Sequence, residues 1–236
     1  IMLLYIVRHG IPDYATDSLK PGGGLQAQEI AKRLAVHGID AVYSSPMGRA
    51  RQTAQPTCDL LGLPMQIEPT FSEALAWDWF TYTRPDGRPD WGFRRRDLTI
   101  GSDAAYSSQD SFSHGFYGDD GKARAGYAQL CAASDGFIAR LGYRRTGEGN
   151  RYEAVRPNGD HIALFCHQGL GLHLLSHLLH IPPHIFTSTF DISHTGLSIV
   201  EFSGEGEVYP LCLCLSDLSH VCTGRLPLKY HDVLDI

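Results

Sequence analysis

The first ten residues constrain this chain most, because a buried strand turns there directly into a cluster of reactive groups. Five apolar or aromatic residues, 3–7, stand in a row. Such a run is typical of a strand that is covered on both faces in a parallel sheet. Arg8, His9 and Gly10 follow at once. Since ligands bind at the carboxyl ends of the strands in open α/β sheets, this corner is a candidate site.

Each residue of this corner offers a distinct chemistry. Arg8 presents a planar fork of donors that suits phosphate or carboxylate. His9 is able to act as a nucleophile, a base or a ligand. Gly10 lets the backbone turn sharply or approach a ligand closely. A single histidine after a strand is more often a hydrogen-bonded structural residue, so the prediction depends on what other segments bring to the same corner.

Two further segments have the same organisation. Residues 40–46 read as a short strand and turn, and a helix then opens with Arg49 in its first turn. Residues 161–166 form a second apolar run, which ends at His167 before another helix. Three strands are therefore expected to bring Arg8, His9, Arg49 and His167 to one edge of one sheet.

These motifs resemble those of the histidine phosphatase superfamily, also called phosphoglycerate-mutase-like, and in particular its phosphatase branch. The resemblance covers the first third of the chain in register and the last third more loosely. It implies an α/β fold of three layers, α/β/α, with a mostly parallel sheet and an inserted cap. The motifs that carry it are Arg8-His9-Gly10, Ser44-Ser45-Pro46 with Arg49-Ala50, Gln52-Thr53-Ala54, Glu73, and the late strand that ends in His167.

The resemblance also implies a catalytic centre for phosphoryl transfer. His9 is expected to attack phosphorus and become a phosphohistidine. Arg8 and Arg49 are expected to hold the phosphoryl oxygens, His167 to donate to the same group, and Gln168 to bind phosphate beside them. Two arginines and a histidine already supply positive charge, so we expect no metal and no cofactor.

Glu73 stands where the family has the residue that protonates the leaving oxygen. Trp77 follows a few positions later, as a tryptophan often does in the family. From the sequence alone, an exposed glutamate at the start of a helix fits equally well. The order of the motifs favours catalysis, with Glu73 as the acid that later activates water.

The chain departs from the family pattern at three positions. Ile11 and Ala15 stand where the family tends to have polar residues, and Lys20 stands where a capping threonine is usual. A donor to the phosphoryl group is thus missing, which favours a phosphatase over a mutase. The function predicted is hydrolysis of a small phosphorylated metabolite. The alternatives are a phosphoglycerate-mutase-type phosphotransferase and a non-catalytic protein that binds a phosphorylated ligand.

Residues 77–127 have no clear periodicity and interleave aromatic residues with arginines. A segment this long inside a compact domain is usually functional or contains short helices. In the resembling family, insertions at this place form a cap that sets specificity. We therefore expect residues 1–236 to form a single domain with a cap insertion at about 77–127.

The remaining secondary structure follows from periodicity and from turn residues. Pro56 is expected to kink the second helix or to end its first part. The expected helices span residues 25–37, 47–61, 122–141 and 169–179, with a hairpin over 142–155 and a late strand over 192–202.

Composition limits the kinds of partner and the location that we expect for this protein. The net charge of −6 gives no reason to expect nucleic acid. No apolar run is long enough to span a bilayer, and no targeting segment precedes the first strand, so we expect no membrane association and a cytoplasmic location. The six cysteines lack the spacing of a disulfide framework and are expected to be reduced thiols.

Two clusters offer an alternative, zinc-dependent hydrolase. Cys212 and Cys214 alternate as two residues on one face of a strand do, and a Cys-X-X-Cys knuckle is missing. His173 and His177 have the spacing of a helical metal site, but leucines fill the gaps between them and no carboxylate accompanies them. Both clusters fit structural roles better.

Overall fold

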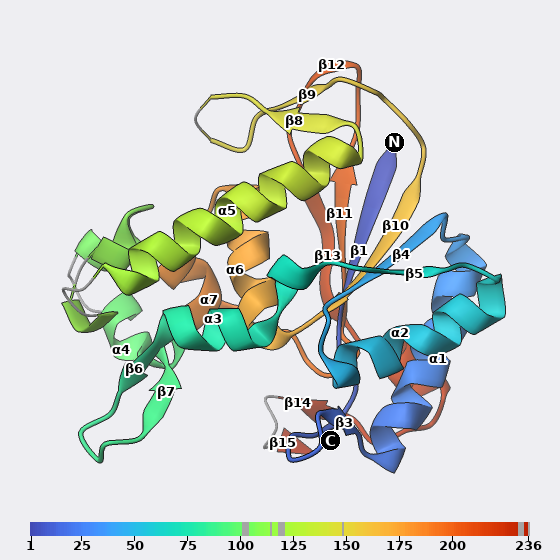
Figure 1. The fold of residues 1–236 in the computed structure, drawn as a ribbon, viewed down its shortest axis with the longest axis horizontal. Helices are drawn as coiled ribbons and strands as arrows, with labels where there is room; N and C mark the ends of the chain where they lie inside the picture. The colour runs from blue at the N-terminus through green and yellow to red at the C-terminus, as the bar shows by residue number, and fades with distance from the viewer. Residues whose placement is uncertain (101–103, 114, 118–120, 148, 231–233, 236) are drawn as a thin grey trace.

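The computed structural model describes all residues except 101–103, 114, 118–120, 148, 231–233 and 236 (Figure 1). Its centre is a six-stranded sheet in the order β13-β11-β1-β10-β4-β5. The strands are β1 (Met2–Arg8), β4 (Ala41–Ser44), β5 (Met65–Ile67), β10 (His161–Cys166), β11 (Leu197–Phe202) and β13 (Leu211–Asp217).

The sheet is mostly parallel, as the sequence predicts. β1 pairs with β10, β10 with β4, and β4 with β5, all in parallel. β11 runs antiparallel to both of its neighbours, β1 and β13, so it is the strand that opposes the rest.

β1 is covered on both faces, which explains its continuous apolar run. Leu4 and Ile6 belong to a hydrophobic cluster on one face of the sheet. Tyr5 and Val7 belong to a second cluster on the other face. Alternate side chains of the same strand therefore anchor two separate layers of helices.

One face of the sheet is covered by α1 (Pro21–His37) and α2 (Gly48–Leu61), with α8 (Ser219–Thr223) against α1 (Figure 1). α1 begins four residues earlier than predicted, because Pro21 occupies its first turn, where a missing N–H costs nothing. α2 continues through Pro56 to Leu61, so the proline does not end the helix.

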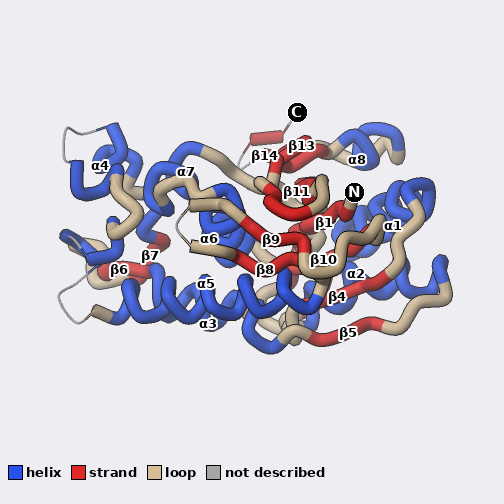
Figure 2. The backbone as a smooth tube through the Cα atoms, turned by 90° about the horizontal axis from the view of Figure 1, so that it is seen from above, coloured by secondary structure: helices blue, strands red, loops and turns tan. Residues whose placement is uncertain are grey.

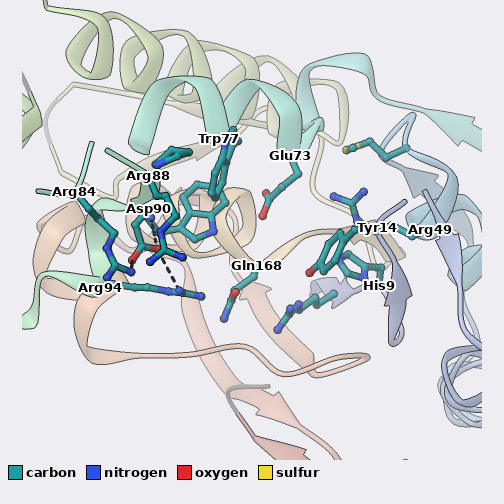
Figure 3. A pocket seen from close by; sticks show the side chains of 14 residues that line it. His9, Tyr14, Arg49, Glu73, Trp77, Arg84, Arg88, Asp90, Arg94 and Gln168 are labelled. Carbon is teal, nitrogen blue, oxygen red and sulfur yellow. Dashed lines mark hydrogen bonds and ion pairs between the residues drawn. The ribbon is translucent and has the colours of Figure 1, made fainter. Parts of the chain in front are cut away.

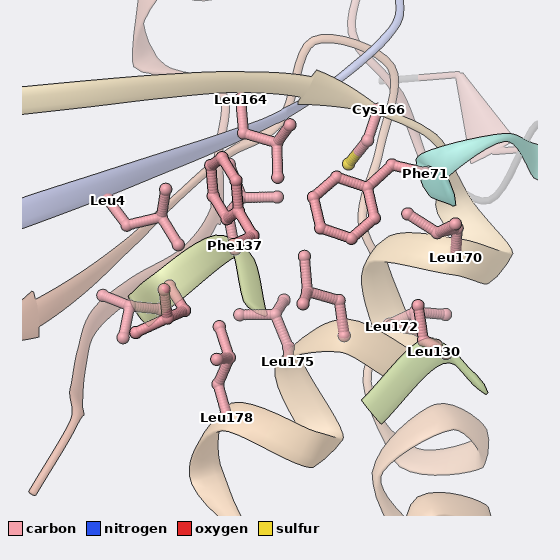
Figure 4. Close-up of a cluster of buried hydrophobic side chains, with 14 of the residues drawn as sticks. Leu4, Phe71, Leu130, Phe137, Leu164, Cys166, Leu170, Leu172, Leu175 and Leu178 are labelled. Carbon is pink, nitrogen blue, oxygen red and sulfur yellow. The ribbon is translucent and has the colours of Figure 1, made fainter. Parts of the chain in front are cut away.

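The other face carries α3 (Glu73–Phe80), α5 (Lys122–Arg140), α6 (Gln168–Leu179) and α7 (Pro183–Thr189). Figure 4 shows the cluster between this layer and the sheet, where Leu4 and Leu164 of the strands meet Phe137 of α5 and Leu175 of α6. The three-layer α/β/α architecture predicted from the sequence is confirmed.

The described residues between 81 and 117 form short elements that extend beyond the end of the sheet (Figure 2). Trp91, Phe93, Phe112 and Tyr117 join the same cluster as the core of α5 and α6. The division into one domain with a cap insertion stays a prediction. The elements are the hairpin of β6 (Thr81–Thr83) and β7 (Pro89–Trp91), η2 (Gly92–Arg94), α4 (Arg96–Ile100), η3 (Ala104–Ser107), η4 (Ser111–Ser113) and η5 (Gly115–Tyr117).

The remaining elements are small. The predicted hairpin is present as β8 (Tyr143–Arg145) and β9 (Tyr152–Ala154), to which β12 (Gly206–Val208) adds a third strand. The others are β2 (Pro12–Asp13), β3 (Ser18–Leu19), η1 (Pro69–Phe71), β14 (Lys229–Tyr230) and β15 (Leu234–Asp235). No helix in the described part of the chain has the length and apolar character needed to cross a membrane.

The late strand predicted over 192–202 begins only at Leu197. Residues 192–196 instead form a turn, in which Thr195 has a left-handed backbone with φ of 55°. Its N–H lies 3.0 Å from the carbonyl of Arg8 and 3.2 Å from that of His9. The turn is thus fastened to the carboxyl end of β1.

Two glycines let the loop after β1 pass close to α1. A Cβ on Gly23 would lie 2.2 Å from the carbonyl oxygen of Ile11, and a Cβ on Gly10 would lie 2.6 Å from that of Gly23. Neither backbone contact leaves room for a side chain. Gly24, the next residue of α1, has nothing within 4 Å of its Cβ position.

We predict that Gly23→Ala lowers the free energy of unfolding by about 1–3 kcal/mol, because the new methyl group forces the loop away from α1. Gly24→Ala is the matched control, and should raise stability by about 0.5–1 kcal/mol through helix propensity. Urea denaturation of both variants measures the difference, and equal midpoints would contradict the close approach.

Candidate active site

Three strand ends meet at one corner of the sheet, as predicted. Arg8 ends β1 and His9 follows it, His167 follows β10, and Arg49 lies in the first turn of α2 after β4. The rings of His9 and His167 have centroids 5.2 Å apart. His194, in the turn before β11, brings a third ring to 5.5 Å from that of His9.

The backbone fixes the tautomer of His9. Its Nδ1 lies 2.8 Å from the carbonyl oxygen of Gly10, which only accepts hydrogen bonds, so Nδ1 carries the proton. The neutral ring then has its lone pair on Nε2. Gly10 is itself held in place, because its N–H donates to the hydroxyl of Thr53 at 2.9 Å.

In His167 the ring nitrogen with a partner in the protein is Nε2, and not Nδ1 as in His9. Its Nε2 lies 2.7 Å from Oγ of Ser45, and that hydroxyl also accepts a bond from the N–H of Met47. A hydroxyl both donates and accepts hydrogen bonds, and when that of Ser45 donates its proton to Nε2, the proton of His167 lies on Nδ1. Nδ1 is buried and has no hydrogen-bond partner among the described residues, so it is the ring nitrogen left to contact a bound group.

Arg8 is almost completely buried, at 2% exposed, and is held from the turn before β11. Nη1 donates to the carbonyl of Ile192 at 2.9 Å, and Nη2 lies 3.0 Å from Nε2 of His194. The same turn that is fastened to the end of β1 thus also fixes the plane of this guanidinium group.

Arg49 is held by a carboxylate. Its Nη1 lies 2.5 Å from Oδ1 of Asp17, while Oδ2 of Asp17 accepts the N–H of Gly48 at 2.6 Å. The ring of Tyr14 lies 5.4 Å from the guanidinium carbon. Nε of Arg49 is buried without a partner among the described residues, so this side chain retains a donor for an anion.

The carboxylate of Glu73 caps the amino end of α6. Oε1 accepts the N–H of Gly169 at 2.9 Å and Oε2 that of Leu170 at 2.8 Å. An acidic group at this end of a helix is favoured by the helix dipole. The exposed glutamate considered as the alternative is therefore wrong: Glu73 is partly buried and ties α3 to the helix that follows His167.

Gln168 is buried at the entrance to α6, and its side-chain amide donates to Asp191. The structure thus gives this residue a partner in the protein. Its proposed contact with phosphate stays a prediction.

Burial and charge shift the titration of these groups. Burial, with the positive charge of Arg8 and the nearby His167, lowers the pKa of His9 well below its usual 6.5. Burial and the charges of Arg49 and Arg8 lower the pKa of His167 in the same way. Burial raises the pKa of Glu73 above 4.5, although the two N–H groups that it accepts oppose this. Neutral histidines thus lie beside a carboxyl group that holds its proton more tightly than usual.

A cavity of about 600 Å³ opens onto this corner (Figure 3). Of the six site residues predicted from the sequence, His167 is fully buried beside His9. The other five line the cavity, together with Tyr14, Met47, Trp77, Arg84, Arg88, Pro89, Asp90, Trp91 and Arg94.

Sequence reasoning missed Asp17 and the role of Ser45. Asp17 lies in an irregular loop with a left-handed backbone, φ of 48°, and nothing in its neighbours indicates a partner 32 positions away. Ser45 belongs to the motif Ser44-Ser45-Pro46 and directly follows a strand. That position, at the edge where ligands bind, is the signal that indicates a contact with the site.

The two clusters considered for zinc have structural contacts. His173 stacks on Phe80 with ring centroids 3.9 Å apart, and His177 lies 2.8 Å from a carboxylate oxygen of Asp135. Cys212 and Cys214 alternate within β13, as the strand pattern predicted. Within the described ranges, no group of three or more histidine, cysteine, aspartate or glutamate side chains could hold a metal ion.

Comparison with known proteins agrees with the motifs. Residues 4–97 match the model of the histidine phosphatase superfamily (branch 1), which confirms the resemblance predicted from the sequence. A curated relative from Hydrogenobacter thermophilus, whose name gives phosphoserine phosphatase 2 as a provisional assignment, is 32% identical over 79 residues. That match spans 30% of this chain and 39% of the relative.

Solved structures share the fold. A phosphoserine phosphatase from Entamoeba histolytica, in complex with 3-phosphoglyceric acid, has a TM-score of 0.61 and 19% identity, over 94% of this chain and all of that one. A mycobacterial glucosyl-3-phosphoglycerate phosphatase has a TM-score of 0.58 and 18% identity, over 89% of this chain and 96% of that one.

We predict that Glu73→Ala lowers the free energy of unfolding by about 1–3 kcal/mol, because it leaves the N–H groups of Gly169 and Leu170 without their acceptor. Asp78→Ala, which removes an exposed carboxylate from the same helix, should leave stability nearly unchanged. Thermal and urea unfolding of both variants provide the comparison. Equal stability would show that Glu73 does not cap α6 in solution.

Proposed function

Since residues 4–97 match the histidine phosphatase superfamily and the chain shares the fold of known phosphatases, we propose that it hydrolyses phosphomonoesters of small metabolites through a phosphohistidine on His9. The observation that carries this proposal is the pair of ring nitrogens left without a partner at the corner of the sheet. His9 has a free lone pair on Nε2, and His167 has a buried, unpartnered Nδ1 that can donate to a phosphoryl oxygen.

The first step transfers the phosphoryl group to the protein. The lone pair of His9 Nε2 forms a bond to phosphorus while the bond from phosphorus to the ester oxygen breaks. Glu73, whose pKa is raised by burial, acts as the acid and passes its proton to the departing oxygen. The products of this step are an alcohol, a phosphohistidine and an ionised Glu73.

The second step regenerates the site. Ionised Glu73 takes a proton from water, and the oxygen of that water bonds to phosphorus as the N–P bond breaks. Inorganic phosphate leaves, His9 recovers its lone pair, and Glu73 is protonated again. The oxygens of Glu73 accept the N–H groups of α6 and also carry the proton that is transferred. At least one of these hydrogen bonds must therefore lengthen or break during the cycle.

Arg8, Arg49 and His167 stabilise the charge that spreads over the phosphoryl oxygens. The two guanidinium groups are fixed in advance by the turn before β11 and by Asp17, so little reorganisation is needed when substrate binds. The two guanidinium groups supply positive charge and the neutral ring of His167 supplies a hydrogen bond, so the reaction that we propose needs no metal.

We expect His9→Ala to remove phosphate release from 4-nitrophenyl phosphate, because the nucleophile is lost. Wild-type activity should persist in excess EDTA. His37→Ala, which changes a histidine of α1 remote from the cavity, is the matched control and should retain full activity. Rapid acid-free quenching with ³²P-labelled substrate should trap label on the wild type and not on His9→Ala.

Activity in His9→Ala comparable to wild type would overturn the proposed nucleophile. Activity lost to the chelator alone would point to a metal-dependent reaction. Transfer of label to a second substrate molecule instead of water would identify a mutase.

Substrates with different leaving groups test whether Glu73 is the acid. An alkyl phosphate needs a proton on its departing oxygen, whereas 4-nitrophenolate leaves without one. Glu73→Gln should therefore lower kcat for an alkyl phosphate by roughly 10²–10⁴-fold and kcat for 4-nitrophenyl phosphate far less. Equal losses for the two substrates would mean that Glu73 only supports the fold.

The pH profile follows from the same two groups. His9 must be neutral to attack, and its lowered pKa keeps it neutral into the acidic range. Glu73 must be protonated, and this form is lost as pH rises through its raised pKa. For alkyl phosphates kcat/KM should thus be highest under acidic conditions and fall toward alkaline pH.

A further inference from the structure

Three arginines gather at the end of the cavity opposite His9 (Figure 3). Arg84 follows β6, Arg88 precedes β7, and Arg94 lies in η2 directly after the hairpin. None of these residues belongs to the motifs that identify the phosphoryl site. They reach the cavity because the β6–β7 hairpin folds toward it.

The hairpin holds its arginines in defined places. The N–H of Arg84 donates to the carbonyl of Arg88 at 2.9 Å, and the N–H of Gly87 donates to the carbonyl of Arg84 at 2.9 Å. Gly87 supplies the positive φ that this tight turn needs. At the base of the hairpin, Trp91 is buried in the core and pairs with Thr81.

Two carboxylates accompany the three cations. Asp86 lies 2.8 Å from Arg88 and 3.4 Å from Arg84, and Asp90 lies 3.2 Å from Arg94 and 3.7 Å from Arg84. One positive charge therefore remains in excess. Each guanidinium group has five N–H donors, and these pairs use few of them. The arginine side chains are 43–76% exposed, so the existing pairs are weak and leave the donors accessible to an anion.

Two tryptophans line the cavity, and Trp77 lies between the three arginines and His9 (Figure 3). The rings of Trp77 and Trp91 meet edge to face, with centroids 4.9 Å apart, and Trp77 remains 39% exposed. An indole offers an apolar surface to a sugar or other ring. The volume of about 600 Å³ lies within the range of sites that bind whole organic ligands, roughly 300–1,000 Å³, and far exceeds the need of one phosphate.

The charge of the cavity contrasts with that of the chain. The protein as a whole carries −6, yet five arginines and two carboxylates line this cavity. A substrate with two anionic groups would be repelled by the protein at large. Local arginines at both ends of the cavity provide the attraction that such a substrate needs.

We propose that Arg84, Arg88 and Arg94 form an outer anion subsite, which binds a second anionic group on the substrate. The substrate class is a phosphomonoester with a carboxylate or a second phosphate, separated from the reacting phosphate by a sugar-sized or ring-sized body that lies along Trp77. This inference rests on the proposed function, because the inner end of the same cavity is the phosphoryl site.

Three sugar phosphates with one pyranose ring test the subsite. Glucose 1-phosphate has no second anion, glucuronic acid 1-phosphate adds a carboxylate at carbon 6, and glucose 1,6-bisphosphate adds a phosphate there. Wild type should show a kcat/KM for one or both of the compounds with a second anionic group that exceeds that of glucose 1-phosphate by about tenfold or more. The better of the two identifies the second group.

The double variant Arg88→Gln/Arg94→Gln should reduce this preference to nearly one, mainly through KM, and should change 4-nitrophenyl phosphate turnover far less. Arg96→Gln removes an exposed arginine that does not line the cavity and is the matched control. It should retain the full preference. The melting temperature of each variant should equal that of the wild type, which shows that the substitutions leave the fold intact.

The outcomes separate this inference from the proposed function. Turnover of 4-nitrophenyl phosphate with equal kcat/KM for all three sugars, or a preference that survives the double variant, would overturn the outer subsite alone. If no substrate is hydrolysed, the proposed function fails, and calorimetric binding of glucose 1,6-bisphosphate and glucose 1-phosphate decides the subsite. Equal affinities for the two compounds would overturn it.

Discussion

The register of β1 against β10 is the constraint on which the site depends. Arg8 pairs with Cys166, and the N–H of His9 donates to the carbonyl of Cys166 at 3.0 Å. His9 and His167, which follow the two strands, therefore lie next to each other. This register is strict because β1 is buried on both faces and a shift by one residue would exchange its two apolar sets. The contact between the two histidine rings therefore follows from the packing of a strand whose own side chains are apolar.

The sequence predicts those parts of the site that depend on local or periodic patterns. Strand ends, the helix that carries Arg49 and the order of motifs are local or follow from periodicity, and they led to the inner site. The orientation of Glu73 toward α6 depends on how α3 packs, and Asp17 acts through a loop with a left-handed residue. Contacts of this kind join distant segments without any repeating pattern, so a single sequence gives no signal for them.

Glu73 illustrates how one group serves the fold and the site together. Its burial favours the neutral acid, while two backbone N–H groups and the nearby arginines favour the charged form. The balance between these effects is set by the distance of α3 from α6. Packing between two helices thus adjusts the protonation of a group that faces the cavity.

The ion pair between Arg49 and Asp17 has a consequence for the end of a catalytic cycle. Asp17 also holds the N–H of Gly48, so this carboxylate stays at the amino end of α2 whether or not an anion is present. In the proposed cycle, an inorganic phosphate bound to Nε of Arg49 shares the guanidinium group with a carboxylate of like charge, which lies 2.5 Å from Nη1. Under that proposal, the competition favours departure of the product over its retention and limits inhibition by free phosphate.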